Sequence, residues 1–418
     1  MYLTEVIIKN VRCCKNLKLS FDGKPESILI VGDNGDGKST VVRSIAMGLC
    51  DESSAAALLR DLPGDFVREN EQEAFISVTF KNIDGKLYKI ETEIKSLKAF
   101  EKIRQRVYKV IKGKKEKVDP DLFPWEDIFV SAYGAGTRTQ GTEDYNYYVP
   151  VDAVYPLFKY DVPLLQNPEL AFRRIADDAQ RRGRNTEDKI KRAKQMSSYL
   201  LDLLKKALNL DSKDRVYLTS TGLKVKSTRW GKVELGALGD GYRAVTTCVL
   251  DLLSWWMLSL KLHDKSIYTN RSVKGIVLID EVEQHLHPRW QIKMVQILSE
   301  LFPDVQFILT SHSPLVISGY KGTSIYQLEK GICTVKKAYG WLPENVYREI
   351  MGLEKLRSLK MEEEIQRYKE LNFLYLKDKL SNKDRNEMNR IKKELLRILP
   401  STDPIVLTSE LENLSKKF

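Results

Sequence analysis

Hydrophobic and polar residues follow two periods along this chain, and the strand-like period dominates its beginning. Apolar residues alternate with polar ones in residues 2–11 and 16–21, which predicts a pair of strands. Continuous apolar runs at residues 28–31, 275–279 and 305–310 are typical of strands that are buried on both faces. We therefore expect a sheet with buried central strands.

The segments between these runs predict a hairpin and helices. Two β-rich stretches, residues 74–80 and 87–90, flank Asp84-Gly85, which favours a hairpin that continues into a lysine-rich antiparallel flap. Residues 169–209 form a helical block with a basic face followed by an apolar set. An α/β protein with a β flap and a helical insertion is expected.

The apolar run that begins at residue 28 leads into a glycine-rich loop with the spacing G-x-x-x-x-G-K-S, and a helical pattern follows. Gly35 and Gly37 let the backbone curl with its N–H groups toward phosphate oxygens, and Lys38 reaches the β- and γ-phosphates. The helix adds the positive end of its dipole. A chance glycine-rich turn is the alternative, but the flanking strand and helix favour phosphate binding. The candidate nucleotide-binding residues of this loop are Gly32, Asp33, Asn34, Gly35, Asp36, Gly37, Lys38, Ser39 and Thr40.

Polar residues end two of the other buried strands. Asp280 and Glu281 follow residues 275–279, and we expect Asp280, with the Ser39 hydroxyl, to hold Mg²⁺. Glu281 is expected to orient or deprotonate the attacking water. His312 follows residues 305–310 and is a candidate contact of the γ-phosphate. The catalytic candidates are thus Glu281 and His312.

A second glycine-rich turn, residues 235–243, opens another helical pattern. The free N–H groups at the start of a helix suit an anion. Without further context, this is a loop-to-helix junction and nothing more. Its candidate nucleotide contacts are Gly239, Asp240 and Gly241.

Composition adds bounds to this picture. The chain has 418 residues, 42% of them apolar and 30% charged, which is typical of a soluble globular protein. Five cysteines show no C-x-x-C pair, so we expect reduced, buried thiols. The apolar run at residues 248–260 is interrupted by Asp251 and is too short to cross a bilayer, and Met1 leads directly into a strand pattern. A cytoplasmic protein without a membrane segment is expected.

The net charge of +11 is concentrated in two zones. Residues 81–118 hold thirteen Lys and Arg against five Asp and Glu, and residues 172–194 hold nine against four. A solvated surface that keeps the protein soluble and a footprint for DNA or other nucleic acid both remain open. The candidate nucleic-acid zones are residues 102–117 and 173–194. The second zone contains three arginines outside every nucleotide motif, namely Arg181, Arg182 and Arg184.

The motifs, in this order, resemble the ABC-type ATPase heads of the RecF, SMC and OLD group. The matching segments are the phosphate loop 32–40, a signature-like stretch 238–242, the Walker B strand ending in Asp280-Glu281, the D-E-V-E-x-x-L-H-P segment 280–288, and His312. The resemblance implies an ABC-type P-loop head that uses ATP and Mg²⁺. It also implies a site split between two chains, and hence a homodimer or larger even-numbered oligomer. Gly239 replaces the usual signature serine, which implies slow hydrolysis.

The same resemblance implies that the chain is divided into four parts. These are residues 1–150 for an N-terminal lobe with Walker A and the β flap, 151–215 for a helical insertion, 216–340 for a C-terminal lobe with the signature, Walker B and switch histidine, and 341–418 for a helical extension.

The end of the chain is similar to the ATPases of Septu-type anti-phage systems, which work beside an HNH nuclease. The similarity lies in residues 347–353 and in a helical tail whose apolar face is formed by Met388, Ile391, Leu395 and Ile398. It implies a switch or sensor subunit that docks a nuclease through its C-terminal helices. Packing of this face on its own domain is the alternative. A RecF-like DNA-binding repair ATPase without a nuclease remains the other candidate function.

Overall fold

The computed structural model divides into two compact units, Met1–Val346 and Tyr347–Phe418, and each is described by itself. The four-part division expected from the sequence stays a prediction. The structure describes the whole chain except residues 98–99, 137–140, 160–163, 165–166, 181–186, 220–221, 264–271, 323, 338–339, 354–356, 378 and 408–418.

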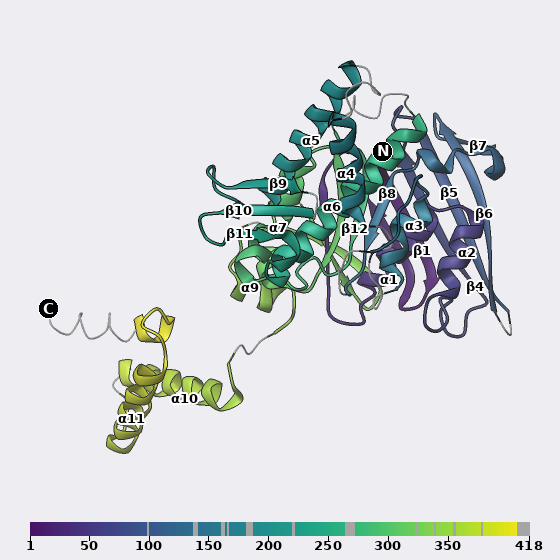
Figure 1. The fold of residues 1–418 in the computed structure, drawn as a ribbon. Coiled ribbons are helices and arrows are strands. Elements are labelled where there is room, and N and C mark those ends of the chain that lie inside the picture. Colours follow the sequence, from purple (N-terminus) through teal and green to yellow (C-terminus); the bar gives the residue numbers. More distant parts are fainter. Residues whose placement is uncertain are drawn as a thin grey trace. The chain divides into compact units, whose positions relative to one another are not determined.

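A six-stranded sheet forms the centre of the first unit, in the order β15-β14-β3-β13-β12-β8 (Figure 1). Its strands are β3 (Ser27–Val31), β8 (Val130–Tyr133), β12 (Gly275–Ile279), β13 (Val305–Ser311), β14 (Ile325–Glu329) and β15 (Ile332–Lys336). All of them run parallel except β15, which pairs antiparallel with β14 at the edge. The central strands β12 and β13 are buried along their whole length, as their continuous apolar runs predict.

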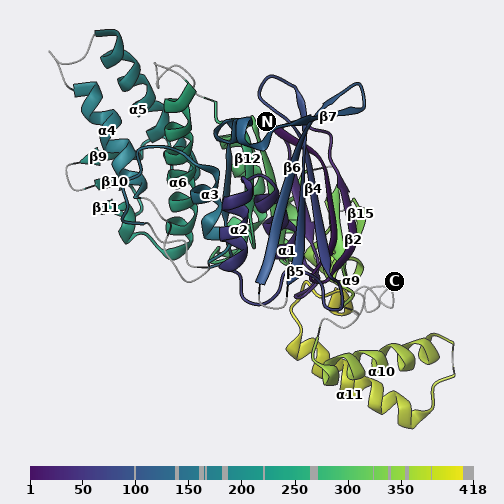
Figure 2. The same cartoon turned by 90° about the vertical axis from the view of Figure 1, so that its right-hand side faces the viewer.

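A second, antiparallel sheet has the order β2-β1-β4-β5-β6-β7. Its strands are β1 (Tyr2–Val11), β2 (Cys14–Ser20), β4 (Glu73–Lys81), β5 (Leu87–Leu97), β6 (Phe100–Ile111) and β7 (Lys114–Val118). Helix α1 (Lys38–Gly48) contacts strands of both sheets, and one apolar core joins the three layers (Figure 2). Helix α1 packs so closely on strand β4 that a Cβ at Gly48 would lie 2.5 Å from the Val78 side chain. The strand pair, the hairpin and the flap that the sequence predicts all belong to this one sheet.

Helices and a small sheet complete the first unit. Helices α4 (Pro168–Gln180) and α5 (Glu187–Ala207) form the predicted helical insertion, and both contact α6 (Asp240–His263). Helix α7 (Pro288–Leu301) packs on α8 (Pro314–Gly319). The remaining elements of this unit are α2 (Glu52–Arg60), α3 (Pro150–Val154), β9 (Arg215–Thr219), β10 (Gly222–Ser227), β11 (Gly231–Glu234) and the 3₁₀ turns η1 (Pro120–Leu122), η2 (Trp125–Asp127), η3 (Tyr155–Leu157) and η4 (Leu235–Ala237). The predicted fold class is confirmed.

The second unit contains a pair of packed helices, α10 (Leu359–Leu376) and α11 (Asn382–Ile398). Helix α9 (Pro343–Glu349) spans the boundary between the units. The apolar face predicted on α11 is largely buried against α10 in a core of six residues, namely Ile365, Tyr368, Leu371, Met388, Ile391 and Leu395. A partner cannot use that face without displacing α10, so the expected docking stripe is wrong as a free surface.

Ile398 departs from the predicted face, since half of its surface is exposed. Other exposed apolar side chains of this unit are Leu359, Phe373, Leu376 and Leu396. Among the helices that the structure describes, none is long and apolar enough to span a membrane.

Candidate nucleotide site

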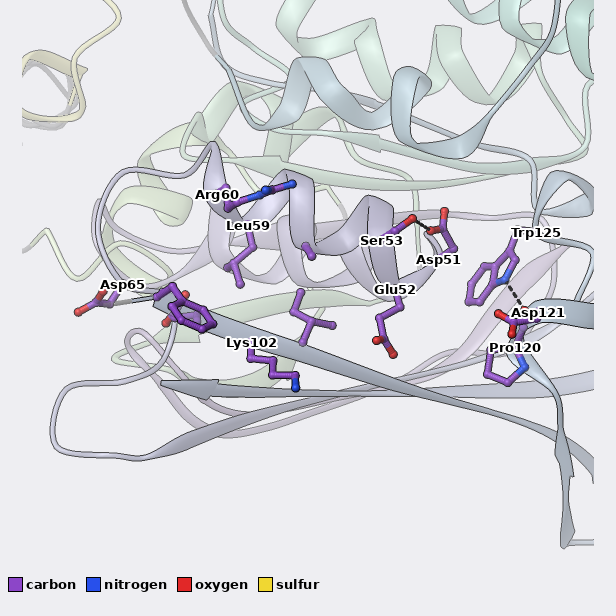
Figure 3. A pocket seen from close by; sticks show the side chains of 14 residues that line it. Asp51, Glu52, Ser53, Leu59, Arg60, Asp65, Lys102, Pro120, Asp121 and Trp125 are labelled. Atoms are coloured by element: carbon purple, nitrogen blue, oxygen red, sulfur yellow. Dashed lines mark hydrogen bonds between the residues drawn. The ribbon is translucent and has the colours of Figure 1, made fainter. Parts of the chain in front are cut away.

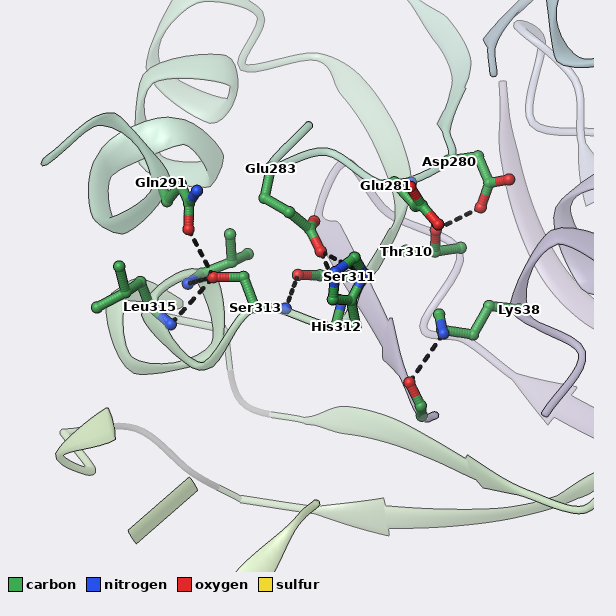
Figure 4. A network of polar contacts seen from close by, with 12 residues as sticks. Lys38, Asp280, Glu281, Glu283, Gln291, Thr310, Ser311, His312, Ser313 and Leu315 are labelled. Carbon is green, nitrogen blue, oxygen red and sulfur yellow. Dashed lines mark hydrogen bonds and ion pairs between the residues drawn. The ribbon is translucent and has the colours of Figure 1, made fainter. Parts of the chain in front are cut away.

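Three predicted clusters meet at one edge of the parallel sheet. The glycine-rich loop follows β3, His312 follows β13, and Asp280-Glu281 follow β12, and these three strands are neighbours. Because the strands are parallel, their carboxyl ends lie at the same edge. Figure 4 shows Lys38, Asp280, Glu281 and His312 in one network of polar contacts.

The glycine-rich loop is held in shape by its own polar groups. Lys38 Nζ donates to the carbonyl oxygens of Gly32 and Asp33, at 2.8 and 3.0 Å. Asp36 Oδ2 accepts the Asp33 N–H at 2.7 Å, and its Oδ1 accepts the Lys330 N–H at 3.0 Å. The charged end of Lys38 is therefore turned into the curl of the loop, where a phosphate would sit.

The start of α1 fits a phosphate group. Gly37, in the left-handed region with φ 100°, is the N-cap of α1, and no side chain caps the helix or places an acid in its first turn. A helix start of this kind leaves backbone N–H groups for an anion. Gly35 has φ 94°, and a Cβ there would meet nothing within 4 Å, so the middle of the loop is open. Ser39 lies in the same first turn of α1.

A threonine that the sequence analysis did not identify organises the acidic pair. Thr310 Oγ1 donates to Asp280 Oδ1 at 2.6 Å and accepts the Glu281 N–H at 2.8 Å. Both Asp280 and Thr310 are fully buried. The Asp280 carboxylate and the Ser39 hydroxyl are hard oxygen donors, which is the ligand chemistry that Mg²⁺ requires.

Glu281 occupies an unusual backbone conformation and a mixed electrostatic environment. Its φ of 49° lies in the left-handed region, which costs energy for a residue other than glycine. Burial raises the pKa of Glu281, as does the neighbouring Asp280, while His312 and Lys38 lower it. These four side chains therefore act on one another electrostatically at the sheet edge.

His312 is oriented by Glu283, a second residue whose role the sequence did not reveal. Its Nδ1 lies 3.0 Å from Glu283 Oε1, and the same oxygen accepts the His312 backbone N–H at 2.7 Å. The Glu283 side chain is 6% exposed, whereas that of His312 is 49% exposed. A buried carboxylate thus fixes an imidazole that reaches out toward solvent.

The second glycine-rich turn does not join this cluster. The atoms nearest to a Cβ at Gly241 belong to residues 285–287, beginning with the His285 carbonyl at 3.2 Å. Tyr242, next in sequence, is packed edge-to-face against Trp230 and Trp290, with ring centroids 4.9 and 5.1 Å away. Asp240 is the first residue of α6, and Gly239 precedes it. The turn is therefore anchored beside the Walker B segment rather than on the phosphate loop.

A cavity of about 1150 Å³ lies between α2 and β6, away from these clusters (Figure 3). Acidic side chains dominate its charged lining, including Asp65, Glu101 and Asp121 against Lys102 and Arg60. No residue of the predicted nucleotide site belongs to it. Since carboxylates repel phosphate, this cavity is unsuited to a nucleotide.

The basic zones are partly neutralised in the structure. Arg106 makes two hydrogen bonds to the Glu93 carboxylate, at 2.7 and 3.3 Å, and Lys115 lies 2.7 Å from Glu91. Part of the positive charge of residues 102–117 is therefore balanced by carboxylates of the neighbouring strand β5. In the second zone, Arg181, Arg182 and Arg184 lie outside the described residues.

The chain is similar to several known proteins. Residues 5–220 match the protein family described as AAA domain, and residues 249–318 match the family described as AAA domain, putative AbiEii toxin, Type IV TA system. The chain is 25% identical over 324 residues to Septu protein PtuA of Bacillus mycoides (strain KBAB4), covering 76% of this chain and 39% of that protein. It is 61% identical over 44 residues to the Retron Vc95 probable ATPase of Vibrio cholerae serotype O1 biovar El Tor, covering 10% of this chain and 9% of that protein.

Among solved structures, the chain is similar to an SMC head bound to the C-winged helix domain of ScpA. The TM-score is 0.47 at 16% identity, and the similarity covers 80% of this chain and 97% of that one. The chain spans well under half of the length of the PtuA relative. The AAA-domain match covers half of the chain, and the phosphate loop, acidic pair and histidine share one sheet edge. The chain therefore belongs to the AAA-domain family and is similar to Septu PtuA.

Proposed function

We propose that this chain binds and hydrolyses ATP as the switch subunit of an anti-phage defence complex and controls a separate nuclease. The observation that carries the ATPase part is the meeting of Lys38, Asp280, Glu281 and His312 at one sheet edge. Phosphate binding, metal binding and water activation are each matched there by a suitable residue.

Each residue has a defined task in this proposal. Lys38 and the N–H groups at the start of α1 bind the phosphates and offset their charge. Ser39 and Asp280 would hold Mg²⁺, which neutralises charge that develops on the phosphate oxygens. Glu281 orients the attacking water, and His312, fixed by Glu283, contacts the γ-phosphate.

A second copy of the chain completes the site. Gly241 lies beside residues 285–287 of its own chain, so we propose that Gly239, Asp240 and Gly241 meet the nucleotide of a facing chain. A homodimer or larger even-numbered oligomer is then required. ATP would join two chains and hydrolysis would release them, which makes the nucleotide state a conformational switch.

The defence role rests on the relatives. Similarity to Septu PtuA and to a retron ATPase favours a defence complex over a RecF-like repair ATPase without a nuclease. The proposed partner is an HNH-type nuclease that docks on the C-terminal helices, through exposed side chains such as Phe373 and Leu376 rather than through the buried face of α11. The neighbouring gene tests this directly, because a nuclease gene supports the proposal and recombination genes support the alternative.

The ATPase proposal is tested with two variants and one control. We expect Lys38→Ala to abolish nucleotide binding, because it removes the charge that contacts the phosphates. Glu281→Gln should bind ATP but lose at least about 100-fold in turnover, since it cannot activate the water. Glu116→Gln, the same change on exposed strand β7, is the matched control. Parental turnover in Glu281→Gln would refute the assigned role of Glu281.

A further inference from the structure

Two adjacent cysteines lie at the turn between β1 and β2, and only one of them is buried. Cys14 is fully buried, whereas Cys13 is partly exposed, and Cys333 is partly exposed as well. The expectation of uniformly buried cysteines is therefore wrong for Cys13, in a turn, and for Cys333, in edge strand β15, because hydrophobic patterning does not tell which side of a turn or an edge strand is covered. This turn lies beside Gly37 of the phosphate loop.

Cys13 and Cys14 pack directly on the phosphate loop. A Cβ at Gly37 would lie 2.6 Å from Cys13 Sγ and 3.1 Å from Cys14 Sγ. On another side, a Cβ at Gly331 would lie 2.4 Å from the Cys13 carbonyl oxygen. Gly37 is the N-cap of α1, the helix whose first N–H groups suit a phosphate. Any group added to Cys13 Sγ therefore has to find room beside the phosphate-binding end of α1.

Cys13 also borders a polar cavity formed by the β1–β2 turn and residues 65–70. Cys13 lines a cavity of about 700 Å³ together with Arg12, Asp65, Arg68 and Glu69. Arg68 Nη1 donates to the carbonyl oxygens of Arg12 and Cys13, at 3.0 and 2.9 Å, so a guanidinium lies beside the thiol. The cavity gives a small polar reagent a path to Cys13 Sγ.

The surroundings also make Cys13 the more reactive thiol. A hydrogen bond from the Cys14 thiol lowers the pKa of Cys13 to about 7, with help from Arg68 and against the effects of burial and Asp36. The same contact and burial raise the pKa of Cys14 far above its ordinary value. Burial raises the pKa of Cys333 to about 11. Since the thiolate is the nucleophile, Cys13 is poised to react at neutral pH and Cys333 is not.

We propose that Cys13 is a thiol-modification site that blocks the nucleotide site, and that its reagent class is a low-molecular-weight disulfide such as oxidised glutathione. The Cys13 thiolate attacks one sulfur of the disulfide and forms a new S–S bond, and the other half leaves as a thiolate that takes up a proton. Cys13 is oxidised and the released half is reduced. The adduct enters the cavity that Cys13 lines, while Cys13 Sγ itself packs on Gly37, so the added group pushes on the phosphate-binding start of α1 and weakens nucleotide binding.

The consequence for nucleotide binding rests on the proposed function, and the experiment separates the two. Full-length protein is treated with oxidised glutathione at pH 7.5, and the modified cysteine is located by peptide mass spectrometry. Binding of a fluorescent ATP analogue is measured before and after treatment. We expect one adduct on Cys13, at least a tenfold loss of affinity, and recovery after dithiothreitol. Saturating ATP should slow modification of Cys13 at least fivefold.

Cys333→Ser and Cys13→Ser are the paired variants. As a test that does not depend on the folding of a variant, the unmutated protein is also labelled with N-ethylmaleimide, and the reactivities of Cys13 and Cys333 are compared. Cys333→Ser should behave like the parent, and Cys13→Ser should keep its affinity after treatment. A Cys13 adduct that leaves nucleotide affinity unchanged overturns the inference, as does equal reactivity of Cys13 and Cys333. A parent that binds no nucleotide before treatment instead contradicts the proposed function, and Cys13 then loses its regulatory consequence.

Discussion

Thr310 is a side chain that supports both acidic residues of the site. Its hydroxyl donates to Asp280 and accepts from the Glu281 backbone N–H. We expect Thr310→Val to lower ATP turnover at least about tenfold, because it leaves a buried Asp280 carboxylate oxygen without this partner, at a cost of about 1–3 kcal/mol, and also removes the partner of the partly buried Glu281 N–H. Phosphate release and thermal unfolding should both be measured.

Thr310→Ser is the matched control, since it keeps the hydroxyl and removes only a methyl group. Turnover near the parental value is expected for Ser and not for Val. Equal loss in both variants would mean that the methyl packing matters and the hydrogen bonds do not.

Gly239 offers a gain-of-function prediction at the signature turn. A Cβ at Gly239 would meet nothing within 4 Å, and its φ is not among the left-handed values, so Gly239→Ser fits without strain. The resemblance to ABC-type heads implies that a hydroxyl here faces the γ-phosphate of the facing chain. We therefore expect faster phosphate release, by about threefold or more, from one added charge-assisted hydrogen bond.

Gly236→Ser in the same turn is the control, because its Cβ would also meet nothing within 4 Å and it precedes the signature stretch. It should leave the rate unchanged. If Gly239→Ser leaves the rate unchanged as well, or lowers it, the residue does not face a nucleotide.

At the scale of elements, the hairpin β6–β7 separates paired from unpaired basic residues. Arg106 and Lys115 are ion-paired, whereas Lys114 and Lys117 have no ion pair with any described residue. If residues 102–117 bind DNA through its phosphates, the double variant of Lys114→Gln and Lys117→Gln should bind DNA more weakly. The slope of a plot of log binding constant against log salt concentration should become shallower by about 2.

The double variant of Arg106→Gln and Lys115→Gln removes the same formal charge from paired positions, and a smaller loss is expected. Binding should be measured by fluorescence anisotropy on two unrelated duplexes over a range of salt concentrations. No binding by the parent at low salt, or equal losses in both variants, would return the zone to a solubilising role.

Local patterns predicted the elements of this fold well. Strands β3, β12 and β13 were predictable because burial on both faces requires continuous apolar runs, and the phosphate loop because its spacing is constrained by backbone geometry. The clustering of their carboxyl ends follows from parallel pairing.

Long-range partners were not predictable, because a pattern records that a residue is buried and not what covers it. Thr310 and Glu283 look like ordinary polar residues until β12 and β13 pair. Tyr242 likewise gives no sign of packing between Trp230 and Trp290. The apolar face of α11 was predicted correctly for three positions, yet its partner proved to be α10.

At the scale of the whole molecule, the site is incomplete in one chain under the proposed mechanism. The Walker residues meet at one sheet edge, whereas Gly241 is anchored beside His285 in the same chain. If a second chain supplies the signature turn, the rate per chain has to depend on how many chains are paired. A site completed within one chain has no such dependence.

Phosphate release per chain, measured against chain concentration with light scattering on the same samples, tests this claim most directly. We predict that the rate per chain rises with concentration and levels off where scattering reports a dimer or larger even-numbered oligomer. In Glu281→Gln it should be at least about 100-fold lower at every concentration. A rate per chain that stays constant while scattering reports a monomer would contradict a shared site. Absence of phosphate release at every concentration would contradict ATP hydrolysis itself.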